Sequence, residues 1–223
     1  ALDEYLPVYK VLSVPLYYYP TSRDFERLRE ALAGRFSTKR ALKDFLRERY
    51  RCYMSEGSLW RLGRERVEVG FEADPPSPPS PALVVVMYRR LSPEADKIVA
   101  SHGLPLSAYA GASEVCGGFY AKDFGTVEAV VDELGRRGAI RDAMIVNATW
   151  LLRLGRNVNI YRLAESGVFV PSVRGGRSVI GTIEDSTVLI TAVGTIYMAK
   201  AVTPEIASSV ARKAYGLIER YGA

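Results

Sequence analysis

The residues with the clearest chemical potential are basic side chains concentrated between positions 35 and 66. Three aromatic residues, Tyr50, Tyr53 and Trp60, lie among them. Cationic groups bind phosphate and aromatic rings stack on bases, so the combination is typical of nucleic-acid contact. A solvated helix face is the alternative interpretation of such a charge run. The basic residues of the stretch are Arg35, Lys39, Arg40, Lys43, Arg47, Arg49, Arg51, Arg61, Arg64 and Arg66.

Residue types suited to catalysis or metal binding are sparse. The sole histidine is His102, and no nucleophile, base and orienting group can be assembled around it. The glycine-rich stretch 111–118 lacks the lysine of a phosphate-binding loop. The acidic pair at 184–185 would need Asp74 or Asp123 to complete a metal site. We therefore expect a non-enzymatic protein with no cofactor and no metal, and keep an enzyme acting on nucleic acid as the rival class.

The composition of the 223 residues favours an intracellular protein with an anionic partner. The formal net charge is +5 and the pI is about 9.2, which favours nucleic acid first and an acidic membrane or protein second. Cys52 and Cys116 have no CxxC spacing, so we expect two free thiols in a cytoplasmic protein. No apolar run reaches membrane-spanning length and no signal peptide is present, so no membrane contact is expected. Abundant Arg, Glu, Tyr and Pro with few Cys and Met indicate a thermophile.

Hydrophobic periodicity predicts alternating strands and helices in the first part of the chain. In order, we expect a strand in 7–19, helices over 22–32 and 37–50, strands over 51–54, 58–63 and 66–73, a Pro/Ser loop over 74–81, a strand over 82–90, and helices over 92–103 and 125–138. Thr21 or Ser22 is expected to cap the first helix, because a side-chain oxygen there can accept a backbone N–H.

The second part of the chain has a simpler pattern. We expect a strand over 142–155, a short helix over 157–165, strands over 177–185, 187–193 and 195–202, and a final helix over 203–222. Thr203 is expected to cap the final helix, with Pro204 in its first turn. The order of strand, helix, strands and helix is found in both parts, so we infer a two-fold internal repeat.

Residues 145–223 resemble one repeat of the TATA-box-binding protein (TBP) family. The sequence IVNATWLLRLGRNVNIYRLAE (145–165) is similar to the first strand and helix of that repeat, and RSVIGTIEDSTVLITAVGTIYMAKAV (177–202) to its strands and turns. Residues 10–32 are similar to the start of the other repeat. The resemblance implies an α+β fold, a TBP-like saddle in which two pseudo-repeats form a curved antiparallel sheet backed by helices, with helical insertions.

The resemblance also implies a division of the chain. We expect an N-terminal half-repeat over 1–110, with an insertion helix at 37–50 and the Pro-rich loop at 74–81. A connecting helical segment would follow over 111–142. The C-terminal half-repeat would occupy 143–223.

In the family, the concave sheet contacts the DNA minor groove through an Asn in each half and Phe side chains that wedge between bases. Asn147 matches that position in the second repeat, whereas Leu12 occupies it in the first. Phe71 matches one wedge and Met54 is a loose match for the other, while Gly176 and Thr191 replace the wedges of the second repeat. Bases should therefore not be wedged apart at that end. The nominated nucleic-acid-binding residues are Asn147, Thr149, Thr191, Val193, Thr195, Tyr197, Phe71, Lys39, Arg40, Lys43, Arg47 and Arg51.

The resemblance and the charge together predict a non-enzymatic, transcription-related, archaeal-type factor that binds nucleic acid, duplex DNA first, and works with a protein partner. Two alternatives remain. The loss of wedges and the presence of Tyr197 also suit a protein–protein interaction module in a larger complex. A nuclease or a glycosylase accessory module is the enzymatic alternative.

Overall fold

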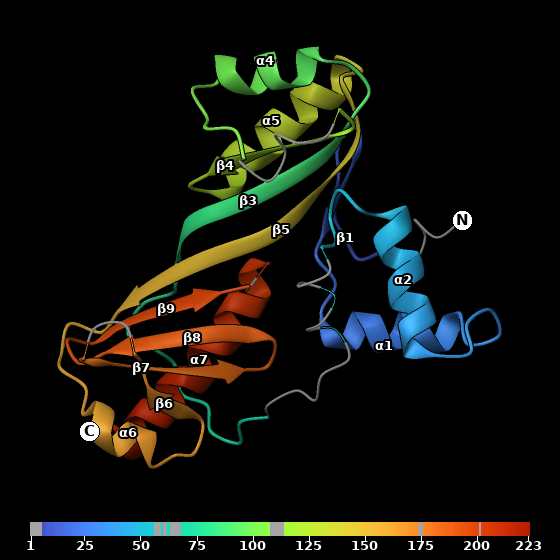
Figure 1. The fold of residues 1–223 in the computed structure, drawn as a ribbon. Helices are drawn as coiled ribbons and strands as arrows, with labels where there is room; N and C mark the ends of the chain where they lie inside the picture. Colours follow the sequence, from blue (N-terminus) through green and yellow to red (C-terminus); the bar gives the residue numbers. More distant parts are fainter. Residues whose placement is uncertain are drawn as a thin grey trace. The chain divides into compact units, whose positions relative to one another are not determined.

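The computed structural model describes residues 6–55, 59, 62, 68–107, 114–173, 176–200 and 202–223. The chain forms two compact units. Unit 1 comprises residues 1–65 and 83–146, and unit 2 comprises residues 66–82 and 147–223. Both combine strands with helices, so the predicted α+β class is confirmed (Figure 1). No described helix is long and apolar enough to cross a membrane.

Unit 1 contains most of the helices. Its elements are β1 (Val8–Val11), β2 (Pro15–Tyr18), α1 (Ser22–Ala31), α2 (Lys39–Arg49), most of β3 (Ser80–Arg90), α4 (Glu94–Ser101), β4 (Cys116–Ala121), α5 (Phe124–Arg136) and the first half of β5 (Ile140–Arg153). β1 pairs antiparallel with β2, and β3 pairs with β4 and β5. β2 pairs with β5 in parallel, so the sheet is mixed, which corrects the expectation of a wholly antiparallel sheet.

The two N-terminal helices form because their caps and apolar spacing agree. Thr21 accepts a hydrogen bond from the Asp24 backbone N–H at 3.3 Å, and Thr38 accepts one from Ala41 at 3.1 Å. The apolar side chains at three- and four-residue spacing then meet in one buried cluster. That cluster includes Phe25, Leu28, Leu32, Leu42, Leu46, Tyr50, Tyr53 and Met54.

Two of the predicted strands are absent from the described residues, and a third is not tested. Residues 51–54 form a turn that continues from α2, because the backbone N–H groups of Tyr53 and Met54 donate to the Tyr50 carbonyl. Their large side chains are buried by helical rather than alternating spacing. Residues 68–73 of the predicted strand 66–73 form no strand and instead lie along α7. The predicted strand 58–63 lies largely outside the described residues.

The two cysteines form a disulfide, which corrects the expectation of free thiols. Cys52 follows α2 and Cys116 begins β4, and their Cα atoms are 5.2 Å apart. The residues are 64 positions apart in sequence. Their proximity depends on how α2 packs in unit 1, so no local spacing could indicate it.

Unit 2 is a five-stranded antiparallel sheet with its helices at the back. Its elements are the second half of β5, α6 (Ile160–Ala164), β6 (Phe169–Pro171), β7 (Ser178–Ile183), β8 (Ser186–Thr191), β9 (Thr195–Ala199) and α7 (Pro204–Tyr221). The strand order is β5-β9-β8-β7-β6. The first strand, the short helix and the long final helix of this unit agree with the sequence prediction, whereas four strands lie between the helices and only three were predicted, because β6 was missed.

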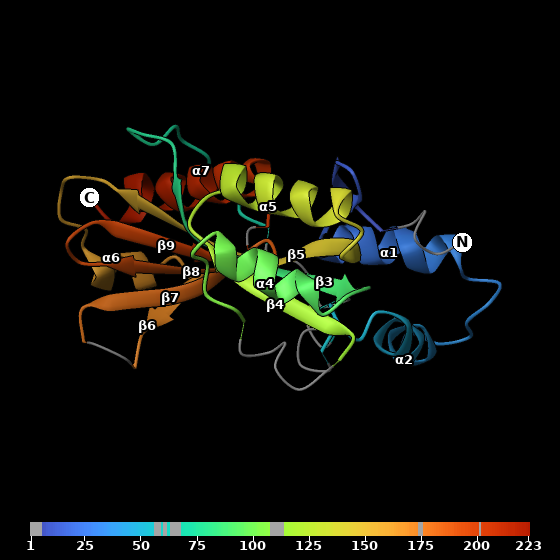
Figure 2. The same ribbon diagram turned by 90° about the horizontal axis from the view of Figure 1, so that it is seen from above.

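α7 packs on one face of this sheet. Thr203 caps it by accepting from the Ile206 N–H at 3.2 Å, and Pro204 is its first residue, as predicted. Figures 1 and 2 show α7 along one side of β7, β8 and β9. Gly194, in the turn between β8 and β9, has φ of 80°, and a Cβ there would lie 1.9 Å from the Arg156 carbonyl oxygen. Glycine is therefore required for this hairpin.

Loss of the disulfide should destabilise the chain measurably. Replacing Cys52 and Cys116 together by Ser should lower the free energy of unfolding by about 4 kcal/mol, because a closed loop of this length restricts the unfolded chain. Urea unfolding followed by circular dichroism would measure it. Dithiothreitol should lower the wild type to the same level and leave the double variant unchanged. Equal unfolding midpoints for the oxidised wild type and the variant would contradict a stabilising disulfide.

Candidate nucleic-acid interface

The register of unit 2 places alternate residues of five strands on the face opposite α7. Tyr197 of β9 lies opposite Leu151 of β5 on one side and Leu189 of β8 on the other. Directly opposite residues in an antiparallel pair project from the same face of the sheet. Their neighbours Trp150 and Met198 are buried on the α7 side. We call the face that carries Tyr197 the open face.

Three rows of side chains cross the open face. The first is apolar, the second carries mainly threonine hydroxyls, and the third is polar and ends in an arginine. In order across the strands they are Val170, Ile180, Leu189, Tyr197 and Leu151; then Thr182, Thr187, Ala199 and Thr149; then Ser178, Thr191, Thr195 and Arg153. None of these residues is an Asp or Glu, although the chain has 25 of them.

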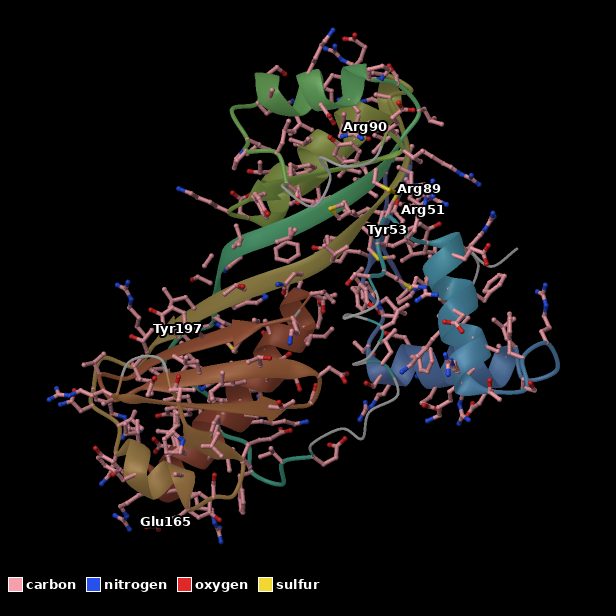
Figure 3. All side chains as sticks on the ribbon, in the orientation of Figure 1. Arg51, Tyr53, Arg89, Arg90, Glu165 and Tyr197 are labelled. Carbon is pink, nitrogen blue, oxygen red and sulfur yellow. A yellow bond between two sulfur atoms is a disulfide. The ribbon has the colours of Figure 1, made fainter. Side chains whose placement is uncertain are left out.

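The open face is accessible within unit 2. The side of the sheet away from α7 faces the viewer in Figure 3, where Tyr197 is labelled. Tyr197 is 44% exposed and Val170 is 61% exposed, high values for large apolar side chains. A contiguous apolar row bounded by hydroxyl groups on an accessible face is typical of a binding surface.

Asn147 lies where β5 enters this face and has a fixed orientation. Its side-chain Oδ1 accepts a hydrogen bond from the Lys200 backbone N–H at 2.9 Å. Lys200 has φ of 65°, a conformation that non-glycine residues rarely adopt, and its Nζ bonds the Thr187 hydroxyl at 3.1 Å. Because Oδ1 is used by the protein, the Asn147 amide NH₂ is the group left to donate to a ligand.

The structure brings most of the nominated residues of the second half together. Thr149, Thr191, Thr195 and Tyr197 share the open face, and Val193 lies in the adjoining turn, 67% exposed. The sequence prediction omitted further members of the same face. These are Leu151, Arg153, Val170, Ser178, Ile180, Thr182, Thr187 and Leu189. A two-residue period counted from Thr149 along β5 and from Thr191 along β8 would have found the members on those two strands.

The nominated cations belong to unit 1 and most are already paired. They are Lys39, Arg40, Lys43 and Arg47 of α2, and Arg51 just after it. Glu26 lies 3.3 Å from Lys39, and Asp44 lies 4.0 Å from Arg40 and 3.5 Å from Arg47. The Lys43 Nζ lies 5.8 Å from the Phe25 ring centre. Exposed pairs of this kind contribute little to stability, so a phosphate could displace them at small cost.

The residues proposed to wedge bases in the first repeat are not on an accessible sheet face. Phe71 lies outside any strand, its ring 4.2 Å from the Arg220 guanidinium and in edge contact with Tyr221. Met54 is 1% exposed in the core of unit 1. The expectation that Phe71 lies in a strand is therefore wrong, because the segment packs on α7 instead of joining a sheet.

The acidic residues considered for a metal site lie in separate interactions. Glu184 accepts from Lys213 and from Ser209, Asp74 pairs with Arg212 at 2.6 Å, and Asp123 caps α5. Within the described residues no three His, Cys, Asp or Glu side chains gather to hold a metal. His102 lies 2.6 Å from Glu133 at the surface of unit 1.

Comparison with known proteins finds similarity among solved structures alone. No family model matches the chain, and no curated protein matches it. Among solved structures, Methanococcus jannaschii TBP matches with a TM-score of 0.48 and 15% identity, over 65% of this chain and 99% of that chain. One fold serves many functions, so the chemistry of the open face, rather than the fold, indicates the ligand.

The contribution of the hydrogen bond from the Lys200 N–H to Asn147 Oδ1 can be measured by the stability of two Asn147 variants. Asn147→Ala should lower the free energy of unfolding by about 1–2 kcal/mol, because the Lys200 N–H loses its acceptor. Asn147→Asp keeps an acceptor and should retain more of the wild-type stability. Urea unfolding of the two variants would measure this. Equal losses for Ala and Asp would show that the bond contributes nothing.

Proposed function

We propose that the chain is a non-enzymatic nucleic-acid-binding factor that contacts duplex DNA through the open face of unit 2. The observation that supports this most is the composition of that face: an apolar row between polar rows, an arginine at the end of one row, and no carboxylate. The DNA minor groove offers few distinguishing hydrogen-bond groups, and proteins that bind it combine apolar contact with a few donors.

The donors required for such contact are present on this face. The Asn147 amide and the threonine hydroxyls can donate to the acceptor atoms of adenine and thymine at the floor of the groove. Arg153 adds a cation for a phosphate at one end of the face. Gly176 and Thr191, at the wedge positions that the resemblance indicates, are too small to separate base pairs as a Phe does. We therefore expect binding with weaker DNA bending than an aromatic wedge would produce.

A protein partner is the second candidate ligand of the open face. Tyr197 and Val170 are exposed members of an apolar row that spans all five strands. Aromatic and aliphatic side chains of this kind also form the centres of protein interfaces. A factor that presents DNA to other proteins would need a second surface for them, whereas a pure interaction module would use the open face alone.

Adding a carboxylate to the open face should weaken DNA binding selectively. Tyr197→Glu should raise Kd for a labelled AT-rich duplex by at least about tenfold, because it places a negative charge against the phosphates. Tyr161→Glu is the matched control, since Tyr161 is 78% exposed on α6 and the change in charge is identical. Fluorescence anisotropy over a salt series would measure both.

The same titrations test the alternatives. Mixed duplex, single-stranded DNA and RNA establish the ligand class, and incubation with Mg²⁺ or Mn²⁺ followed by electrophoresis tests for cleavage. No binding to any nucleic acid at low salt would overturn the proposal and leave the open face to a protein partner. An equal effect of the two Glu variants would place the ligand elsewhere.

The basic face of α2 should contribute to the salt dependence of DNA binding and not to its sequence preference. Replacing Lys39, Arg40 and Arg47 by Gln should flatten the slope of log Kd against log salt without altering sequence preference, because such cations bind phosphates. An unchanged slope would show that this face is only solvated.

A further inference from the structure

Unit 1 contains a cavity of about 310 Å³ whose wall is rich in arginine. Five arginines line it, namely Arg49, Arg51, Arg89, Arg90 and Arg141, and Glu48 is its one carboxylate residue among the described residues. Figure 3 labels Arg51, Arg89 and Arg90 in one region of unit 1, with Tyr53 beside them. We call this cavity the arginine pocket.

Arg89 is held in place by a buried carboxylate. Its Nε donates to Asp142 Oδ1 at 2.7 Å and its Nη2 donates to Oδ2, while the Tyr53 hydroxyl donates to Oδ1 as well. The side chains of Arg89 and Asp142 are 11% and 5% exposed. The hydrogen bond to Asp142 raises the pKa of Arg89, and burial beside Asp142 raises the pKa of Tyr53. Arg89 therefore stays charged and rigid.

Arg90 is fixed in a similar way. Its Nε and Nη2 donate to the two oxygens of Asp96 at 3.0 and 2.8 Å, and its Nη1 donates to the Cys116 carbonyl. The Tyr88 hydroxyl donates to the same carboxylate at 2.6 Å. The charges of Arg89 and Arg90 are thus balanced by Asp142 and Asp96, and both side chains form a rigid part of the wall.

The other three arginines are exposed and have no ion pair or side-chain hydrogen bond to any described residue. Arg49 is the last residue of α2, Arg51 follows its C-cap Tyr50, and Arg141 lies on β5. The partial negative charge at a helix C-terminus favours cations there, which explains the placement of the first two. The guanidinium N–H groups of Arg49 and Arg51 nevertheless have no hydrogen-bond acceptor among the described residues. Glu48 is the one opposing carboxylate that the described residues contribute to the wall, so they give the pocket an excess of positive charge.

The disulfide joins two sides of the pocket. Cys52 lines it directly, and Cys116 provides the carbonyl that accepts from Arg90. The segment after α2, which carries Arg51, is therefore covalently tied to the start of β4. A site fixed in this way loses less conformational entropy when a ligand binds.

We propose that the arginine pocket binds the phosphoryl group of a nucleotide-sized ligand. Guanidinium groups match phosphate oxygens in charge and bidentate geometry. The volume is at the lower end of the range for small-molecule sites, roughly 300–1,000 Å³, and exceeds what one phosphate needs. Leu91 and Val115 line the same cavity and are 64% and 43% exposed, which provides apolar contact for the remainder of the ligand.

Two kinds of ligand could supply this phosphoryl group: a free nucleotide, or the terminal phosphorylated nucleotide of a nucleic-acid strand. The inference goes beyond the proposed function and does not rest on it, because the pocket belongs to unit 1 and the open face to unit 2. Failure of nucleotide binding by the arginine pocket can therefore be distinguished from failure of DNA binding by the open face. Tyr197→Glu should leave nucleotide binding unchanged.

Calorimetric titration of the full chain tests the pocket. The probes are inorganic phosphate, AMP, ADP and adenosine, together with a short oligonucleotide with and without a 5′-phosphate. We expect ADP to bind more tightly than AMP and adenosine not to bind. Arg49→Gln, Arg51→Gln and Arg141→Gln combined should weaken ADP binding by at least about tenfold, because each removes charge-assisted hydrogen bonds.

The matched control replaces three other exposed cations of unit 1. Arg27, Arg35 and Lys122, each changed to Gln, alter the net charge equally and do not line the pocket. This control should change Kd by no more than about twofold. Tighter binding of the 5′-phosphorylated oligonucleotide than of ADP would identify a strand end as the source, and the reverse a free nucleotide. Equal losses in both triple variants, binding of adenosine, or no binding of any phosphate would overturn the proposal.

The carboxylate that holds Arg90 should make unit 1 sensitive to acid. Burial raises the pKa of Asp96, but hydrogen bonds from Arg90 and Tyr88 outweigh it and leave that pKa below its usual value. The stabilisation is therefore complete above about pH 4, the unfolded value, and is lost as pH falls through the lower folded value. Urea unfolding from pH 7 to 3 should show a smaller acid loss in Asp96→Asn than in the wild type. Parallel curves would contradict this.

Discussion

The sheet of unit 2 is packed on one side only, and this constraint determines what the unit can do. α7 covers the face that carries Trp150, Ile190, Ile196 and Met198, all of which are buried. An antiparallel sheet tolerates solvent on its second face when that face is partly polar. Here the second face keeps an apolar row, so burial against a ligand remains favourable at roughly 25 cal/mol per Å² of apolar surface. Threonine rows on either side keep the unliganded face compatible with water.

In unit 1, by contrast, some polar side chains are buried and paired rather than exposed to water. Desolvating Arg89 and Asp142 is costly, and such a buried pair often contributes no net stability compared with apolar residues. What the pair provides is a fixed position, since three hydrogen bonds from Arg89 and Tyr53 converge on one carboxylate. A rigid, neutralised wall beside unpaired arginines is suited to anion binding, because little reorganisation is needed when the ligand arrives.

Local features of the fold were predictable from the sequence, and features that depend on distant pairing were not. Thr21 or Ser22 was expected to cap the first helix and Thr203 the last, because a cap depends on a few adjacent residues, and the structure has Thr21 and Thr203. The Cys52–Cys116 bond could not be inferred, since its partners meet only after α2 packs in unit 1. Residues 51–54 resembled a strand, and the hydrogen bonds from the Tyr53 and Met54 backbone N–H groups to the Tyr50 carbonyl show a turn instead.

The candidate sites, too, have parts that local sequence predicts and parts that depend on distant pairing. Thr149 and Tyr197 were nominated through the family resemblance, and their strands could be found locally. Leu151 and Leu189 could have been found by the two-residue period along β5 and β8, but their place on either side of Tyr197 depends on the register between strands. The arginine pocket combines residues from α2, β3 and β5, and the sequence shows these only as separate basic spots.

The edge of the unit 2 sheet restricts how a partner can approach. β6 is the terminal strand, three residues long, and ends in Pro171, which has no N–H to donate. Short strands and proline at an edge oppose the addition of a further strand. A ligand is therefore expected to meet side chains on the open face rather than backbone at the edge. The rows of that face would then set specificity through shape, apolar contact and the orientation of Asn147, and a groove suits such a surface better than an extended peptide does.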